Sequence, residues 1–212
     1  MSDKEKILQR IRAALAQKSE ETVRPPDFSA DVYAPAEEQD LAVLFAKRLL
    51  DVQGFFCFCE NEQEFLQNLF ALLRSKRTKE IFVWEKYIQQ VLDLAEVAYQ
   101  ADDSRFHEAE MSITTCEALI ARTGSVLVSS KRASGRRLNI YPPVHVVVAF
   151  TSQLCYDLRS ALQSIQQSSS TMPSMLSLIT GPSRTADIEK TLVLGAHGPK
   201  ELHVFLIEDL IE

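Results

Sequence analysis

The strongest constraint on the fold is a regular alternation of helical and strand-like segments after residue 40. Apolar side chains at helical spacing predict helices over 41–52, 61–73, 87–94 and 151–165. Short, continuous apolar runs predict strands over 55–58, 81–84, 118–120, 125–128, 144–150, 175–179 and 202–207. Continuous apolar strands that alternate with helices are typical of a sheet buried on both faces. The sequence therefore predicts an α/β fold around a mostly parallel sheet.

Local signals mark the ends of several of these helices. Ser2 with Glu5 forms a capping box at the start of a short N-terminal helix, and Asn61 is the expected N-cap of the helix over 61–73. Gly54 is expected to end the preceding helix in the left-handed conformation, which glycine adopts without steric cost.

Residues 1–40 differ in composition from the rest of the chain. The N-terminal helix carries an apolar stripe of Ile7, Leu8, Ile11 and Leu15, and residues 18–39 are mostly polar with three prolines. Such a segment has too few apolar side chains to offset the conformational entropy of ordering it. We therefore expect an N-terminal helix and extended linker arm over 1–40, removable without unfolding a domain over 41–212.

Composition and charge exclude several classes of protein. The 212 residues are 46% hydrophobic and 25% charged, as in globular domains, and the net charge of −6 argues against a nucleic-acid binder. No apolar run approaches the roughly 18 residues of a membrane span, and the charged start predicts no secretory signal. The cysteines, with no CxxC and no metal spacing, are typical of reduced cytoplasmic thiols; they are Cys57, Cys59, Cys116 and Cys155.

The charge is distributed unevenly along the chain. Between residues 118 and 186 one acid, Asp157, accompanies seven basic residues: Arg122, Lys131, Arg132, Arg136, Arg137, Arg159 and Arg184. A local positive field of this kind favours a small anionic ligand, either a carboxylate or a phosphate ester. The four basic residues around Gly135 have a second interpretation, as the solvated tip of a hairpin.

The segment over 180–189 offers the donors that an anion needs. It follows a predicted strand, Gly181 permits close backbone approach, and Pro182 suits the first position of a helix. Arg184 supplies a planar set of donors, and the start of a helix after a strand binds anions. The alternative is a structural turn in which Asp187 or Glu189 pairs with Arg184.

Other segments supply further candidates. The turn over 122–125 could present backbone N–H groups to the same ligand, or be an ordinary turn. His145 follows two prolines, and His197 lies in a glycine-flanked loop, although a lone histidine is more often structural. Glu117 is the candidate general base or nucleophile. The predicted ligand-binding residues are Arg122, Thr123, Gly124, Ser125, His145, Gly181, Pro182, Ser183, Arg184, Thr185, Asp187, His197 and Gly198, with Glu117 and His197 as catalytic candidates and no metal ligands.

Several enzyme classes lack their motifs here. The chain contains no GxSxG, GxxxxGK[ST], GxGxxG or HExxH, so the common hydrolase, NTPase, dinucleotide-binding and zinc-protease interpretations are set aside. Cys57 and Cys59 alternate on one strand among phenylalanines, where core packing is the expected role.

Four segments, in this order, resemble the LUD-domain family, and within it the branch of lactate utilisation protein C, also called the YkgG family. They are EALIARTGS (117–125), YPPVH (141–145), GPSRTADIE (181–189) and LGAHGP (194–199). The resemblance implies a three-layer α/β/α sandwich like that of the NagB/RpiA/CoA-transferase superfamily. It also implies a part in oxidising L-lactate to pyruvate beside iron–sulfur partner subunits. The chain lacks the clustered cysteines of those partners, so it resembles the accessory subunit and is expected to hold no redox cofactor.

Three hypotheses stay open at this point. The chain is an accessory subunit that binds a small anion or a partner, without redox chemistry of its own. Alternatively, it is an enzyme of the superfamily that acts on a small carboxylate, a CoA ester or a phosphosugar. The third hypothesis is a regulatory module that senses a carboxylate. A homo-oligomer is compatible with each of them.

Overall fold

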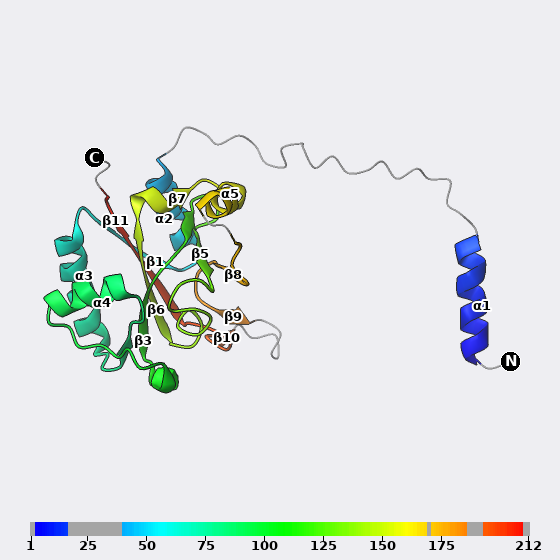
Figure 1. The fold of residues 1–212 in the computed structure, drawn as a ribbon, viewed down its shortest axis with the longest axis horizontal. Coiled ribbons are helices and arrows are strands. Elements are labelled where there is room, and N and C mark those ends of the chain that lie inside the picture. Colours follow the sequence, from blue (N-terminus) through cyan, green and yellow to red (C-terminus); the bar gives the residue numbers. More distant parts are fainter. Residues whose placement is uncertain (1–2, 17–39, 169–170, 186–192, 210–212) are drawn as a thin grey trace. The chain divides into compact units, whose positions relative to one another are not determined.

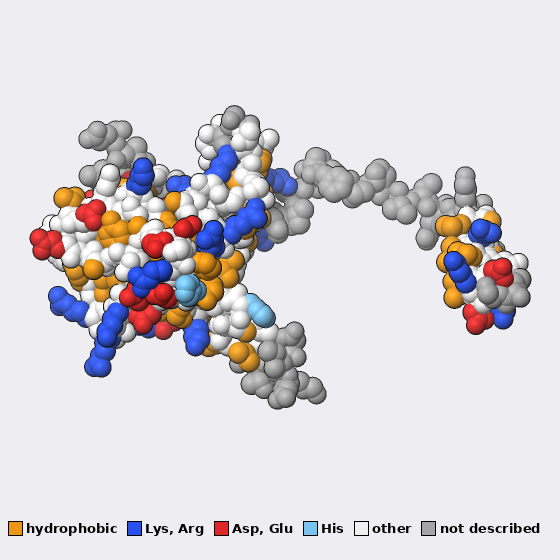
Figure 2. All heavy atoms as spheres, turned by 60° about the horizontal axis from the view of Figure 1, so that its bottom comes forward, with side chains coloured by type: hydrophobic (Ala, Val, Ile, Leu, Met, Phe, Trp, Pro, Cys, Tyr) orange, Lys and Arg blue, Asp and Glu red, His pale blue; other side chains and the backbone are white. Residues whose placement is uncertain are grey.

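The computed structural model describes residues 3–16, 40–168, 171–185 and 193–209. The chain divides into two compact units, Met1–Pro35 and Ala36–Glu212. In the first unit, helix α1 (Asp3–Ala16) confirms the predicted N-terminal helix, and its side chains are all exposed. Figure 2 shows apolar side chains beside charged ones at its surface. The exposed apolar side chains include Ile7, Ile11 and Leu15. None of the described helices is long and apolar enough to cross a membrane.

The second unit is built around a five-stranded parallel sheet (Figure 1). Its strands, in spatial order, are β1 (Phe55–Cys59), β11 (Glu201–Ile207), β6 (Val144–Phe150), β3 (Met111–Thr115) and β2 (Ile81–Phe82). The central strands β6 and β11 are almost entirely buried, which explains their unbroken apolar sequences. The predicted α/β fold with a mostly parallel, helix-flanked sheet is confirmed.

Two helices cover one face of this sheet. Helices α3 (Glu62–Lys76) and α4 (Lys86–Leu94) bury Phe65, Leu69 and Ile88 against the strands. The predicted N-cap of α3 is confirmed, because the Asn61 side chain accepts a hydrogen bond from the Glu64 N–H at 2.9 Å. These helices lie on the left of the sheet in Figure 1.

The other face is covered by a helix together with a second sheet. Helix α2 (Leu41–Asp51) buries Phe45 and Leu49 there. Beside it lies a four-stranded sheet in the order β7 (Leu154–Cys155), β4 (Ala118–Ile120), β5 (Ser125–Ser129) and β8 (Leu176–Ile179). Helix α5 (Leu158–Ser168) packs on this sheet through Ala161 and Ile165. In the second sheet β5 runs antiparallel to both of its neighbours, a feature that the alternation pattern does not indicate.

Three expectations about local structure are wrong. Gly54 does not take the left-handed conformation; Gln53 does, with a φ of 64°. A Cβ atom at Gly54 would lie 2.4 Å from Leu49 Cδ1, so a side chain there would displace the buried Leu49. The helix expected from residue 151 begins at Leu158, because residues 151–155 form a 3-10 turn, η2 (Thr151–Gln153), and strand β7. Residues 184–185 form a strand, β9 (Arg184–Thr185), where the start of a helix was expected.

Candidate functional site

The two turns of the predicted anion site do meet in the structure. Ser125 Oγ lies 2.8 Å from Thr180 Oγ1 and donates to Thr123 Oγ1, also at 2.8 Å. The cause is antiparallel pairing, in which Val126 at the start of β5 faces Ile179 at the end of β8. The two turns therefore meet through antiparallel pairing and not, as expected, because each follows a strand of a parallel sheet. Their hydroxyls bond mainly to one another.

No helix begins after Gly181 in the described residues, so the expected helix N-terminus is wrong. Arg184 and Thr185 instead form strand β9, which pairs with β10 (Val193–Leu194). A Cβ atom at Gly181 would lie 2.3 Å from Val52 O, just beyond α2, and the Arg184 guanidinium donates to that same carbonyl oxygen. This hairpin is thus fastened to the end of α2 by two contacts that use Gly181 and Arg184.

Neighbouring predicted residues also have partners within the fold. The Ser183 N–H donates to Pro199 O at 2.8 Å, and Gly198 lies against the Ser183 side chain. Pro182 is buried, His197 is exposed, and Asp187 lies outside the described residues. Whether these residues bind an anion stays a prediction.

The turn over 122–125 is packed on α2. The N–H groups of Thr123 and Gly124 donate to Ile120 O and Ala121 O at 3.3 and 3.4 Å, so they do not form an open nest. A Cβ atom at Gly124 would lie 2.3 Å from Leu49 N, and Gly124 has a φ of 61°. The half-buried Arg122 donates its backbone N–H to Tyr156 O at 3.0 Å.

His145 lies within strand β6 and is completely buried. Its Nε2 atom is 2.8 Å from Thr114 Oγ1, and its Nδ1 atom has no hydrogen-bond partner among the described residues. Burial lowers the pKa of His145 to about 3, so the imidazole is neutral at physiological pH. It therefore cannot attract an anion by charge.

Glu117 is held by a bidentate ion pair. Arg132 donates from Nε to Oε1 and from Nη2 to Oε2, both at 3.0 Å, and the Ser129 hydroxyl donates to Oε1 at 2.6 Å. Partial burial raises the pKa of Glu117, but these donors outweigh it and leave the pKa below its ordinary value. In this arrangement both carboxylate oxygens are occupied, and the pair anchors the loop between β5 and β6.

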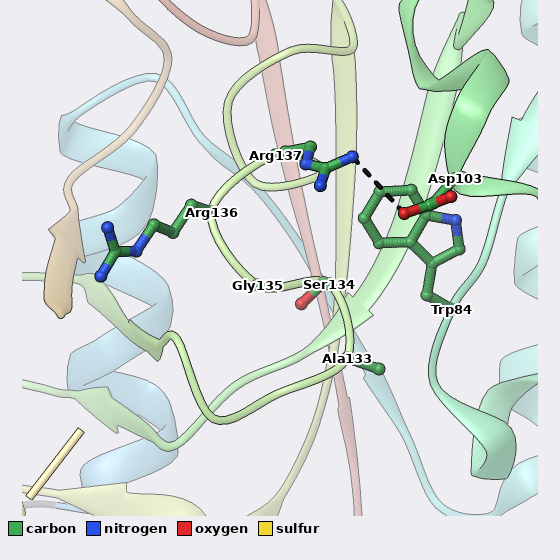
Figure 3. Close-up of a pocket in the computed structure, with 7 residues that line it drawn as sticks. All are labelled: Trp84, Asp103, Ala133, Ser134, Gly135, Arg136 and Arg137. Carbon is green, nitrogen blue, oxygen red and sulfur yellow. Dashed lines mark ion pairs between the residues drawn. The ribbon is translucent and has the colours of Figure 1, made fainter. Parts of the chain in front are cut away.

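The same loop forms one wall of a pocket of about 400 Å³ (Figure 3). The pocket is lined by Trp84, Asp103, Ala133, Ser134, Gly135, Arg136 and Arg137. Trp84 lies two residues after the last residue of β2, near the carboxyl end of that strand, where ligands gather in α/β sheets. Two of the four residues that could have been a solvated tip, Arg136 and Arg137, line this pocket.

Arg137 is the best-positioned cation in the pocket. Its guanidinium carbon lies 5.9 Å from the centre of the Trp84 ring and 5.2 Å from that of Phe106. Its Nη1 atom is 3.6 Å from Asp103 Oδ2, an ion pair too long for a hydrogen bond. Figure 3 shows the Arg136 side chain directed away from Trp84, and this arginine donates to Ser174 Oγ at 3.0 Å.

Buried polar groups surround the pocket wall. Glu85 is 7% exposed, Ser134 1% and Asn139 3%, and Glu85 Oε1 accepts the Ser134 N–H at 3.2 Å. Burial raises the pKa of Glu85 despite the hydrogen bond from the Ser134 backbone N–H. Among the described residues, four buried atoms here have no hydrogen-bond partner: Trp84 Nε1, Glu85 Oε2, Ser134 Oγ and Asn139 Oδ1. Unpartnered buried polar atoms are uncommon in native proteins and call for an explanation.

Trp84 and Glu85 were not predicted from the sequence as site residues. A signal for them exists, because a tryptophan and an acid lie two and three residues after a buried strand of a parallel sheet. No group of three or more His, Cys, Asp or Glu side chains suited to a metal ion occurs in the part of the chain that the structure describes. Cys59 lies in the main core cluster with Cys57 packed against it.

The sequence matches the family model of the LUD domain over residues 1–207. An uncharacterized protein of Neisseria meningitidis is 40% identical over 88 residues, which are 42% of this chain and 38% of the relative. Lactate utilization protein C of Bacillus subtilis is 33% identical over 105 residues, 48% of this chain and 44% of the relative. The matched region thus covers less than half the length of either relative.

The fold also resembles a solved structure. The crystal structure of a DUF162 family protein from Deinococcus radiodurans superposes with a TM-score of 0.58 at 18% identity, covering 82% of this chain and 99% of that one. At this identity the likeness concerns the fold alone. The family model, however, spans nearly the whole sequence, including the segments that first indicated the family. The chain therefore belongs to the LUD domain family.

Proposed function

We propose that this protein takes part in L-lactate utilisation as an accessory subunit that binds a small anion and does no redox chemistry itself. The observation that carries this proposal is its similarity to proteins named lactate utilization protein C, at 33% identity for Bacillus subtilis and 31% for Bacillus licheniformis. These alignments cover less than half of either relative. The part in lactate utilisation is therefore proposed from the shared region alone.

The geometry favours a binding protein over an enzyme of the CoA-transferase kind. Such an enzyme needs a carboxylate that is free to attack its substrate. Glu117, the candidate nucleophile, has both oxygens engaged by Arg132. Arg137, which lines the pocket, supplies the donors that an anion needs without a nucleophile.

Partner subunits with iron–sulfur clusters would then carry the electrons, in the cytoplasm. Pull-down of the tagged chain from lactate-grown cells tests this part of the proposal. Recovery of proteins with stoichiometric iron and acid-labile sulfide, absent from a mock pull-down, is the expected outcome. Recovery of the tagged chain alone would contradict the partnership.

A deletion strain tests the function itself. We expect a strain without this gene to grow normally on glucose and to fail on L-lactate as the carbon source, with growth restored by the wild-type gene. Normal growth of the deletion strain on L-lactate, in a background without another lactate dehydrogenase, would refute the proposal.

A further inference from the structure

We infer that the pocket beside Trp84 binds a small carboxylate with an oxygen on the adjacent carbon, that is, a 2-hydroxy or 2-oxo acid. Arg137 would hold the carboxylate, and the Ser134 hydroxyl would bond to the second oxygen. The choice of lactate as the probe rests on the proposed function, whereas the position of the site rests on the pocket itself.

Arg137 is already oriented for this task. Contacts with the Trp84 and Phe106 rings restrict its guanidinium, so little rotamer entropy is lost when it binds a ligand. Its only ion pair among the described residues is with Asp103, at 3.6 Å, and the Asp103 side chain is 68% exposed. An exposed pair of this length contributes little, so the N–H groups of Arg137 remain open to a bidentate carboxylate.

A second polar requirement is built into the wall. The Ser134 hydroxyl lines the pocket and is almost fully buried, and no group among the described residues bonds to it. Leaving such a group unpaired costs free energy, which a ligand oxygen would recover. A hydroxyl can donate to or accept from that oxygen.

Size is consistent with a small organic acid. A pocket of about 400 Å³ lies near the lower end of the range of small-molecule sites. A three-carbon acid fills part of it, and the remaining space accommodates water that bridges to Asp103 or to the loop.

The single tryptophan makes the site directly observable, since Trp84 is the sole tryptophan of the chain. The full-length protein is titrated with L-lactate and with acetate, which lacks the second oxygen, and binding is followed by Trp84 fluorescence and by calorimetry. We expect a saturable change with L-lactate and at least tenfold weaker binding of acetate.

Variants assign the site. Arg137→Gln is expected to weaken L-lactate binding at least tenfold in calorimetry, whereas Arg159→Gln, which removes the same charge from helix α5, changes it less than twofold. Melting curves establish that both variants fold. If Arg137→Gln does not fold, Arg137→Lys replaces it, since lysine keeps the charge but not the bidentate donors.

Three results would overturn the inference: no saturable binding of L-lactate, equal affinity for acetate, or loss of binding in Arg184→Gln with binding intact in Arg137→Gln. Complementation separates its failure from that of the proposed function. If the Arg137→Gln gene restores growth on L-lactate as well as wild type, the pocket inference fails and the function stands. If the deletion strain grows on L-lactate while purified protein binds lactate through Arg137, the function fails and the site stands.

Discussion

Replacement of the buried His145 provides a quantitative test of the core. Its folded-state pKa of about 3 lies far below the ordinary 6.5, so the folded protein keeps the imidazole neutral while the unfolded chain protonates it below about pH 6.5. The stability from this group is therefore complete above pH 6.5 and falls as the pH falls. At pH 5, about 1.5 pH steps lower, the loss at roughly 1.4 kcal/mol per step is about 2 kcal/mol.

The assay is urea unfolding at pH 7.5 and pH 5, followed by far-UV circular dichroism. His145→Asn removes the titrating group, so the difference in unfolding free energy between the two pH values should be about 2 kcal/mol smaller than in wild type. The variant also deprives the buried Thr114 hydroxyl of its partner at 2.8 Å, which lowers stability by about 1–3 kcal/mol at both pH values.

The comparison between variants isolates His145 from other groups, such as His203, whose pKa is also lowered by burial. His107→Asn is the matched control, because this side chain is 58% exposed, and it should retain the wild-type pH dependence. The same pH dependence in His145→Asn as in wild type would refute the reasoning, because the imidazole would then have access to protons in the folded state.

Three further predictions follow from the packing. Gly124→Ala should lower the free energy of unfolding by about 2–5 kcal/mol, and Gly135→Ala by about 1–2 kcal/mol. Both glycines have a positive φ, but only at Gly124 would the added methyl group lie within 2.4 Å of helix backbone. Equal losses of stability in chemical denaturation would contradict this prediction. Wild type should lose stability relative to Glu85→Gln as the pH rises above 4.5, because burial raises the folded-state pKa of Glu85; parallel stability–pH curves would contradict it. Removal of residues 1–39, which keeps Asp40 as the N-cap of α2, should leave the melting temperature of the rest within about 2 °C, and aggregation of the shortened chain would show that the exposed α1 stripe has a packing role.

Much of the fold follows from short-range physics. Asn61 caps α3, and the apolar run of β6 must be buried on both faces wherever it pairs, so both elements are readable from their own residues. Strands β1 and β11 and helix α4 are equally local features. Strand β3 was missed because its Ser112 and Thr114 break the apolar pattern, and these hydroxyls are satisfied only by distant partners, Leu138 O and His145 Nε2.

The candidate site is likewise predictable only in part from the sequence. Its basic residues and glycine-containing turns are visible in the sequence, but the groups that they contact are not. Arg184 contacts Val52 O, 132 residues away, and Glu117 is paired with Arg132. The hydrogen-bonding capacity of an arginine is the same for a ligand, an acid or a carbonyl, so sequence alone cannot select among them.

What the sequence by itself determined is therefore most of the helices and strands, the family and the excess of basic residues between β4 and β9. Only the tertiary structure decided that residues 154–155 leave the expected helix, because Leu154 pairs with Leu119 in the second sheet. It also decided that Arg137 is held between Trp84 and Phe106 at a pocket, while Arg136 turns away. The physical reason is that periodicity and capping depend on neighbours within a few residues, whereas strand direction, burial and ion pairing depend on groups that only the folded chain brings together.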